Sequence, residues 1–464
     1  DLPEPPLFDN DNVSILKKLI KTLIEISQSK NQTEIWDSFR LKEVSPSLFE
    51  ALCFLLLSTD NGLFQYGAKI YTILLGLEIR STIWNPNLFN SVLSLLISAQ
   101  QILENGSNLS DETKSQLENG FEILNILNKS ISDSLINLLG PEVLIALMEI
   151  TVKLCTGIRP ELEKYNQDFL KCSLDLLKKI PNDNLDYLLP FLVEPLLLKF
   201  AINSNTLTLR IEKIRDKILE FVLTIFKSDD PRLELLCKHL ILRSPEKAHL
   251  KRSASYVVFK ISLYYDNTKD IINFVMKLSK SSKIGNRSIA SYLLQLYIVN
   301  IEELEKKIGD ESSELIMQMV GCIKSELTDI SSTVRSNGLD AVSNIISNLN
   351  TNSFGTVIKH IIDTNGYLFN ILKRRSIDEK HVVRKAAIIC IYEIIKTMKN
   401  SLLLPMIDLL TDRIRDKAVS IRQTVIRYLS SCLDIFPDNK ELIEIWLDNV
   451  LPSALDTEKT VQTE

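Results

Sequence analysis

Hydrophobic residues recur along this chain at the spacing of amphipathic helices. Between residues 13 and 24 they stand three and four positions apart, so they share one helical face. The same spacing predicts further helices over 47–57, 65–77, 88–103, 116–127, 141–154, 168–179, 185–200, 245–264, 271–278 and 287–299. Only 13 of the 464 residues are glycine, which favours helices over a sheet protein with many tight turns. The pattern predicts an all-α chain.

A short motif recurs near the C-terminal end: an Asp, a Val or Ile five residues later, and then an Arg. The copies are Asp329, Val334, Arg335; then Asp378, Val383, Arg384; then Asp416, Ile421, Arg422; and a fourth, Asp456 and Val461, followed by Gln462. The Asp positions are 49, 38 and 40 residues apart. A period of about 40 residues, built from two helices, is typical of HEAT repeats. We therefore predict an α-solenoid of HEAT/armadillo-like helical hairpins.

Each position of the motif has a physical role. The Asp would lie in the turn between two helices and cap the second helix with its side-chain oxygen. The Val or Ile would face the core. The Arg would reach a turn carboxylate in its own or the neighbouring repeat. Because stacked repeats contact only their neighbours, we expect these residues to form a structural ladder that fixes how the repeats dock.

Composition along the chain suggests its organisation. Residues 1–12 predict an irregular lead-in, and 13–230 predict degenerate helical repeats with a polar loop near 105–116. Residues 231–464 predict HEAT repeats, clearest from 301, with an insertion near 348–356 and a truncated last repeat. We expect the sequence to be a piece of a longer protein.

Candidate catalytic chemistry is not suggested by the spacing of reactive residues. The seven Cys lie at least 17 residues apart, and the four His are isolated from one another. We predict no catalytic, cofactor or metal site, and therefore no enzyme. The most apolar run, 188–198, is too short to cross a bilayer, so no membrane span is predicted.

The charge distribution points to a different function. Residues 373–427 contain 13 basic and 6 acidic residues, a net charge of +7, whereas the whole chain carries −5. Another basic turn, 277–287, contains Lys277, Lys280, Lys283 and Arg287 without an acid, but solvated basic turns are common and it is not a candidate contact. A cationic patch on an acidic body is a candidate contact for phosphate groups. Cations that end a helix or belong to the ladder are the structural alternative.

The candidate phosphate contacts exclude the Arg residues of the ladder. They are Lys373, Arg374, Arg375, Lys380, Lys385, Arg413, Arg415 and Lys417. Few aromatic side chains accompany them, which argues against stacking on the bases of a single strand.

Several longer segments resemble a known family. They are "DISSTVRSNGLDAVSNII", "LKRRSIDEKHVVRKAAIICIYEII", "DRIRDKAVSIRQTVIRYLSSCL" and "WLDNVLPSALDTEKTVQ", with "PEKAHLKRSASYVVFKI" and "FVMKLSKSSKIGNRSIASYLL" upstream. From about residue 245 to the end, the sequence resembles the D-type HEAT-repeat subunit of condensin II.

The resemblance implies a non-catalytic subunit of a chromosome-compacting complex in the nucleus, located on chromosomes. Its partners would be the kleisin subunit, the SMC ATPase heterodimer, a second HEAT-repeat subunit, and DNA or nucleosomes. It would not bind a membrane. It implies a role in mitotic chromosome condensation. The alternative is a nuclear transport receptor or a phosphatase scaffold, which also use HEAT repeats but bind only protein partners.

Overall fold

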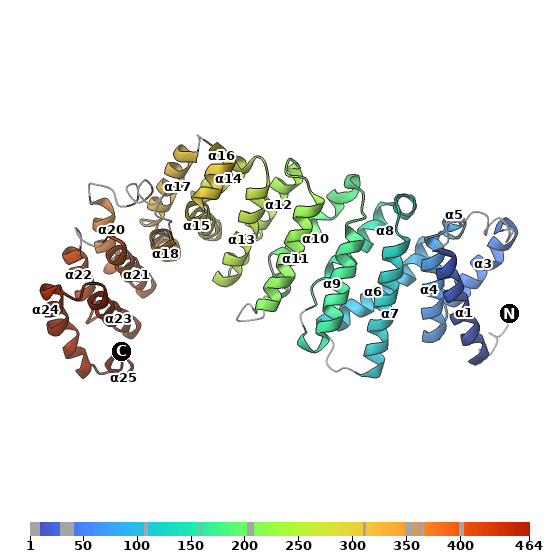
Figure 1. Cartoon of the computed structure of the whole chain (residues 1–464), viewed down its shortest axis with the longest axis horizontal. Coiled ribbons are helices and arrows are strands. Elements are labelled where there is room, and N and C mark those ends of the chain that lie inside the picture. Colours follow the sequence, from blue (N-terminus) through green and yellow to red (C-terminus); the bar gives the residue numbers. More distant parts are fainter. Residues whose placement is uncertain are drawn as a thin grey trace. The chain divides into compact units, whose positions relative to one another are not determined.

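The computed structural model describes residues 10–27, 41–105, 110–157, 159–201, 208–309, 312–348, 357, 361, 366–398 and 403–464. All regular elements among these residues are helices, and the predicted all-α solenoid is confirmed (Figure 1). The chain divides into two compact units, Asp1–Phe226 and Lys227–Glu464. The division lies close to the boundary predicted at residue 230.

The first unit is a stack of helical hairpins. Its helices are α1 (Asn10–Ser27), α3 (Leu41–Leu56), α4 (Asn61–Leu75), α5 (Arg80–Ile83), α6 (Pro86–Asn105), α7 (Asp111–Ser130), α8 (Asp133–Leu154), α9 (Glu163–Leu177), α10 (Leu189–Leu196) and α11 (Leu209–Ile225). Short 3₁₀ turns occupy Pro160–Leu162, Asn182–Tyr187 and Lys199–Ala201. The first helices of the hairpins, α3, α6, α8 and α10, pack in one row, and α4, α7, α9 and α11 pack in a second row.

Several predicted boundaries in this unit are wrong. Helix α1 begins at Asn10 rather than residue 13, and α3 begins at Leu41, which leaves Pro46 inside the helix. The polar loop ends at Ser110, because the Ser110 side chain accepts a hydrogen bond from the N–H of Thr113 and starts α7 earlier than expected. The helix predicted over 185–200 is instead α10 between two 3₁₀ turns.

Helix α8 is long and apolar enough, by length and composition, to cross a membrane, which the sequence analysis did not recognise. Its backbone is not continuous, because Gly140 has φ 73° and ψ 166° and is followed by Pro141. Helices α6, α9 and α10 pack against it. The buried apolar side chains of α8, among them Leu144, Leu147 and Met148, belong to the core of the first unit.

The second unit is built from hairpins whose second helices form a continuous row. Its helices are α12 (Pro231–Leu242), α13 (Ala248–Tyr264), α14 (Thr268–Leu278), α15 (Ile284–Val299), α16 (Ile301–Ile308), α17 (Ser312–Glu326), α18 (Ser332–Asn348), α20 (Tyr367–Ser376), α21 (His381–Met398), α22 (Leu403–Thr411), α23 (Val419–Ile435), α24 (Lys440–Asn449) and α25 (Lys459–Gln462), with a 3₁₀ turn at Leu451–Leu455. Helices α13, α15, α18, α21 and α23 pack in succession. The insertion predicted at 348–356 lies outside the described residues except for Asn348.

The Val and Ile positions of the recurring motif lie in the core, as predicted. Val334, Val383 and Ile421 are completely buried, and Val461 is buried as well. Each stands in the first turn of a second helix, where an apolar side chain is removed from water by the neighbouring hairpin. This burial positions the adjacent Arg at the edge of the core.

Candidate nucleic-acid interface

In the second unit, each turn that joins the first and second helices of a repeat contains an equivalent hydrogen bond. The motif Asp accepts from the backbone N–H two residues later: Asp329 from Ser331, Asp378 from Lys380, Asp416 from Ala418, and Asp456 from Glu458, at 2.7 to 3.1 Å. The prediction that the Asp caps the helix directly is therefore wrong. The Asp lies two positions before the N-cap residue, whose N–H donates to it, and it orders the turn that leads into the helix.

The Arg of each motif binds two turns at once. Arg384 donates to the carboxylate of Asp416 in the next repeat, with distances of 2.9 Å from Nε and 2.7 Å from Nη2. Its Nη1 donates to the carbonyl of Asp378 in its own turn, at 2.9 Å. Two other Arg residues use the same atoms: Arg335 with Asp378 and the carbonyl of Asp329, and Arg422 with Asp456 and the carbonyl of Asp416. The carboxylate thus belongs to the neighbouring repeat.

The ladder has one more member than the sequence analysis assigned. Arg287 donates to the carbonyl of Ser281 at 2.8 Å and to the carboxylate of Asp329 at 2.9 Å. Ser281 precedes Arg287 by six residues, the spacing of each motif Asp from its Arg. That spacing was the available signal, and Ser in place of Asp concealed it. At the other end, Gln462 donates to the carbonyl of Asp456 in its own turn.

The ladder carboxylates are held in their charged form. The side chains of Asp378 and Asp416 are only 4% and 3% exposed. Burial by itself raises their pKa values, but hydrogen bonds from Arg335 or Arg384, together with a backbone N–H, outweigh it. The net result is that the pKa of each carboxyl lies below its ordinary value. These pairs fix the stacking of the repeats.

Two of the eight predicted phosphate contacts are engaged with the ladder. Arg375 donates to the Asp378 carboxylate at 2.7 Å, and Arg413 lies 4.0 Å from that of Asp416. Each side chain is largely withdrawn from solvent. A guanidinium that neutralises a buried carboxylate is less available to an external phosphate.

The other six predicted contacts are exposed. Within the described part of the second unit they form no salt bridge; they are Lys373, Arg374, Lys380, Lys385, Arg415 and Lys417. They lie at the end of α20, after α22, in the turns that follow, and in the second turn of α21. Cations of two consecutive repeats therefore lie at similar positions, in or next to the turn that joins the two helices of each repeat.

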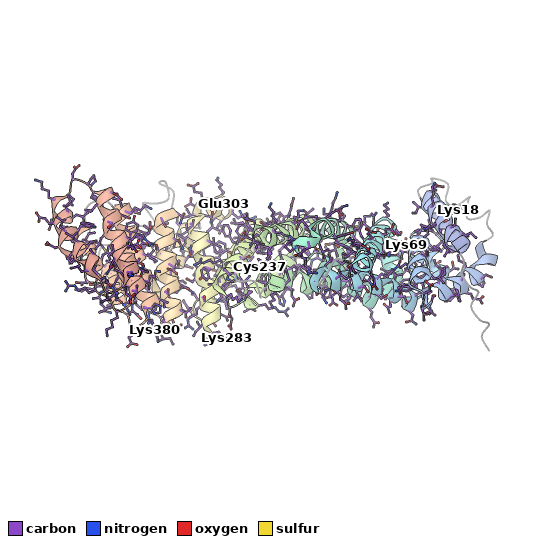
Figure 2. All side chains as sticks on the ribbon, turned by 90° about the horizontal axis from the view of Figure 1, so that it is seen from below. Lys18, Lys69, Cys237, Lys283, Glu303 and Lys380 are labelled. Atoms are coloured by element: carbon purple, nitrogen blue, oxygen red, sulfur yellow. The ribbon has the colours of Figure 1, made fainter. Side chains whose placement is uncertain are left out.

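We use the term turn row for the turns that the ladder joins, residues 280–284, 328–332, 376–382 and 412–418. Arg287 links the first of these turns to the second, Arg335 links the second to the third, and Arg384 links the third to the fourth. Lys283 and Lys380 project from one edge of the second unit, and Glu303 projects from the opposite edge (Figure 2). The basic turn at 277–287 therefore continues the cationic edge.

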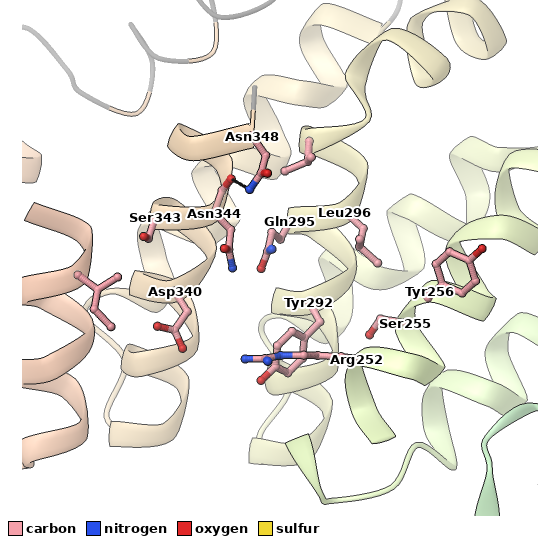
Figure 3. Close-up of a pocket in the computed structure, with 12 residues that line it drawn as sticks. Arg252, Ser255, Tyr256, Tyr292, Gln295, Leu296, Asp340, Ser343, Asn344 and Asn348 are labelled. Carbon is pink, nitrogen blue, oxygen red and sulfur yellow. Dashed lines mark hydrogen bonds between the residues drawn. The ribbon is translucent and has the colours of Figure 1, made fainter. Parts of the chain in front are cut away.

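A groove of about 550 Å³ lies on another surface of this unit, along α13, α15 and α18 (Figure 3). The guanidinium of Arg252 stands 5.6 Å from the ring of Tyr292, and Asp340 faces them across the groove. Burial raises the pKa of Asp340, and the charge of Arg252 opposes that effect. Gln295 and Asn344 line the same groove. These side chains can bind polar ligands, but they do not form a nucleophile with an adjacent base.

The described residues provide little basis for metal binding or for thiol reactivity. Within them, no three His, Cys, Asp or Glu side chains gather closely enough to hold a metal ion. All seven Cys are free, and all except the half-buried Cys53 are buried. Burial raises the pKa of the Cys155 and Cys432 thiols to about 12, which keeps them protonated and unreactive.

Parts of this chain are similar to known proteins. Residues 324–437, which contain three Arg residues of the ladder, match the family described as "Sister chromatid cohesion protein PDS5 protein". The chain is 25% identical over 256 residues to condensin-2 complex subunit CAP-D3 of Arabidopsis thaliana, covering 51% of this chain and 19% of the relative. It is 23% identical over 291 residues to condensin-2 complex subunit D3-L of Xenopus laevis, covering 50% and 20%.

These two relatives confirm the predicted resemblance to the D-type subunit of condensin II. The matched region spans about a fifth of each relative's length. Among solved structures, Pds5 in a Pds5–Scc1 complex has a TM-score of 0.44 at 15% identity, covering 98% of this chain and 69% of that chain. Kap121p bound to Pho4p has a TM-score of 0.43 at 12% identity, covering 96% and 45%.

Proposed function

We propose that this chain is part of a non-catalytic HEAT-repeat scaffold subunit of condensin II. In this role it binds the kleisin subunit and associates with the SMC ATPase heterodimer and a second HEAT-repeat subunit, in the nucleus and on chromosomes. Its activity is to support mitotic chromosome condensation. Similarity to two condensin-2 D3 subunits supports this assignment.

The chain's own contribution is a contact with the phosphate backbone of DNA along the turn row and the helix ends next to it. The observation that carries this proposal is a group of exposed cations on two consecutive repeats that form no salt bridge with any residue that the structure describes: Lys373, Arg374, Lys380, Lys385, Arg415 and Lys417. Cations in this arrangement attract phosphates whatever the base sequence. Arg375 and Arg413 act mainly through the ladder, because both lie against its carboxylates.

A pair of charge reversals tests the DNA contact. Lys380→Glu with Lys417→Glu removes two cations from the turn row, and Lys306→Glu with Lys440→Glu is the matched control. Lys306 and Lys440 are exposed, and they lie on α16 and at the start of α24, outside the turn row. Both double variants change the net charge equally, so a difference between them reports position rather than overall charge.

Duplex DNA binding by the assembled complex is measured across a salt series. If Lys380 and Lys417 each neutralise one phosphate, their reversal flattens the slope of log affinity against log salt by about 2. The control pair leaves that slope unchanged. If both variants and the parent showed equal slopes, the turn row would not be a DNA contact.

Co-purification tests the assignment to condensin. We expect the chain to recover SMC and kleisin proteins from nuclear extract. Recovery of a small GTPase or a phosphatase subunit, without SMC or kleisin proteins, would favour the transport-receptor or phosphatase-scaffold alternative.

A further inference from the structure

The turn row exposes large aliphatic side chains as well as cations. Ile330 is 94% exposed, Ile377 is 62% exposed, and Ile284 and Val382 are each nearly half exposed. Turns that face water usually carry Gly, Pro, Asn, Asp or Ser. Four exposed aliphatic residues in three consecutive turns form a recurring feature that folding of the described residues does not require.

The ladder fixes where these side chains point. Arg335 donates to the carbonyl of Ile330 at 3.0 Å while it holds the Asp378 carboxylate, so the turns of Ile330 and Ile377 are neighbours. The Ile330 carbonyl faces the guanidinium, and the Ile330 side chain is exposed to solvent. Arg287 joins the carbonyl of Ser282, beside Lys283 and Ile284, to Asp329 in the same way. The aliphatic positions are thus held in a row by the hydrogen bonds of the ladder.

Cations stand among these aliphatic residues. Lys283 immediately precedes Ile284, and Lys380 lies three residues after Ile377. Both Lys residues are exposed. A phosphate backbone gains nothing from a neighbouring isoleucine, whereas a partner that carries both carboxylates and aliphatic side chains can use the whole edge.

We propose that the turn row docks an acidic protein segment with interspersed aliphatic side chains. The segment places its aliphatic side chains over Ile330 and Ile377 and its carboxylates near Lys283, Lys380 and Lys417. Docking excludes DNA from Lys380 and Lys417, so the two ligands compete. The docking site rests on the ladder geometry and stands whether or not the proposed DNA contact is correct, whereas the competition rests on that contact.

A protein segment fits this edge better than an anionic lipid surface does. Glu379, between Asp378 and Lys380, is exposed on the same turn. A flat membrane would have to desolvate that carboxylate or leave the apolar side chains outside. A peptide can leave the Glu379 carboxylate in water, because its individual side chains can contact the aliphatic residues and cations of the turn row separately.

The probe is a fluorescein-labelled peptide of four Asp-Leu-Glu-Ser repeats, with a control peptide in which each Leu is replaced by Ser. Fluorescence anisotropy with the full chain gives both affinities. We expect Ile330→Ser with Ile377→Ser to weaken binding of the Leu peptide roughly tenfold, through loss of two aliphatic contacts. Duplex DNA binding by this variant stays unchanged. Circular dichroism and melting verify its fold, which exposed positions should preserve.

The matched control is Leu242→Ser with Met317→Ser, two exposed apolar positions on α12 and α17 outside the turn row. It leaves peptide affinity unchanged. Lys380→Glu with Lys417→Glu weakens the Leu peptide, and unlabelled duplex DNA displaces that peptide from the parent.

Three results would overturn the docking proposal. They are equal binding of the two peptides, unchanged affinity of the Ile variant, and isoleucine-dependent binding to vesicles of equimolar phosphatidylcholine and phosphatidylserine without peptide binding. If the parent failed to bind DNA but bound the Leu peptide with dependence on Ile330 and Ile377, the proposed DNA contact would fail and the docking site would stand.

Discussion

Removing one guanidinium from the ladder tests whether these pairs hold the repeats together. Arg384→Ala deletes two hydrogen bonds to the Asp416 carboxylate and two to the carbonyls of Asp378 and Glu379. The Arg384 side chain is 13% exposed, and that of Asp416 is 3% exposed. Asp416 would therefore lose its main counter-charge while it remained buried.

The magnitude follows from what Asp416 keeps. Breaking a buried ion pair by removing one partner costs about 3 to 5 kcal/mol. Asp416 retains the N–H of Ala418 at 2.9 Å, and Arg413 lies 4.0 Å away, close enough to supply part of the lost charge. We expect Arg384→Ala to cost about 2 to 4 kcal/mol. Arg384→Gln should cost less, because Gln462 shows that an amide can still reach the carbonyl of its own turn.

The assay must detect local opening, because stacked repeats need not unfold as a single unit. Hydrogen exchange followed by mass spectrometry on α21, α23 and the distant α13 supplies this resolution. Urea unfolding gives the total free energy of unfolding. We expect faster exchange in α21 and α23 and unchanged exchange in α13. Arg374→Ala, which removes an exposed cation near the same turn, is the control for charge.

The pH dependence gives an independent check. The lowered pKa of Asp416 means that its contribution is fully present above the unfolded value of 3.8 and is lost as the pH falls through the lower folded value. The stability difference between parent and Arg384→Ala should therefore shrink in acid. If Arg384→Ala melted like the parent at neutral pH and lost DNA binding instead, Arg384 would be a ligand contact and the structural reasoning would be wrong.

Two other predictions concern buried positions. Glu326 is buried and its pKa is raised to about 8, mainly by burial, with Asp329 adding to the shift and Ser291 and Arg287 opposing it. Parent stability should therefore fall by an amount on the order of 5 kcal/mol as the pH rises from well below 4.5 to well above 8. Urea titrations of Glu326→Gln should show that this fall is lost. A flat pH profile of the parent would contradict the burial of this carboxyl. A Cβ at Gly67 would lie 2.6 Å from the Cβ of Leu55, so Gly67→Ala should separate α3 from α4 at a cost of about 1 to 3 kcal/mol, measured by exchange in those helices, whereas Gly285→Ala meets no atom within 4 Å and is the control.

Local sequence patterns predicted much of the fold. The recurring Asp and the apolar residue five positions later predicted the repeats and the buried faces of Val334, Val383 and Ile421, because helical periodicity and burial act over a few residues. Boundaries were less accurate where capping decided them. Ser110 starts α7 earlier than its polar surroundings indicated, and Ser132 caps α8 so that it begins at Asp133, eight residues before the start predicted at residue 141.

The assignment of cations to roles depended on contacts between repeats. From the sequence, Arg375 and Lys380 were equivalent candidates for phosphate, yet Arg375 binds the Asp378 carboxylate and Lys380 projects into solvent. Arg287 was grouped with a basic turn, yet it pairs with Asp329, 42 residues later. Sequence spacing does not determine such pairings, since they form only when two hairpins stack.

The sequence by itself determined the repeat, its period and its core-facing positions, because each depends on side chains within one or two helical turns. Tertiary structure decided which carboxylate each Arg binds, and it placed cations and isoleucines from separate repeats in one row. Those arrangements join residues 32 to 43 positions apart. Their geometry is set by how the hairpins stack and by the lengths of the segments between them, not by any local preference of the chain.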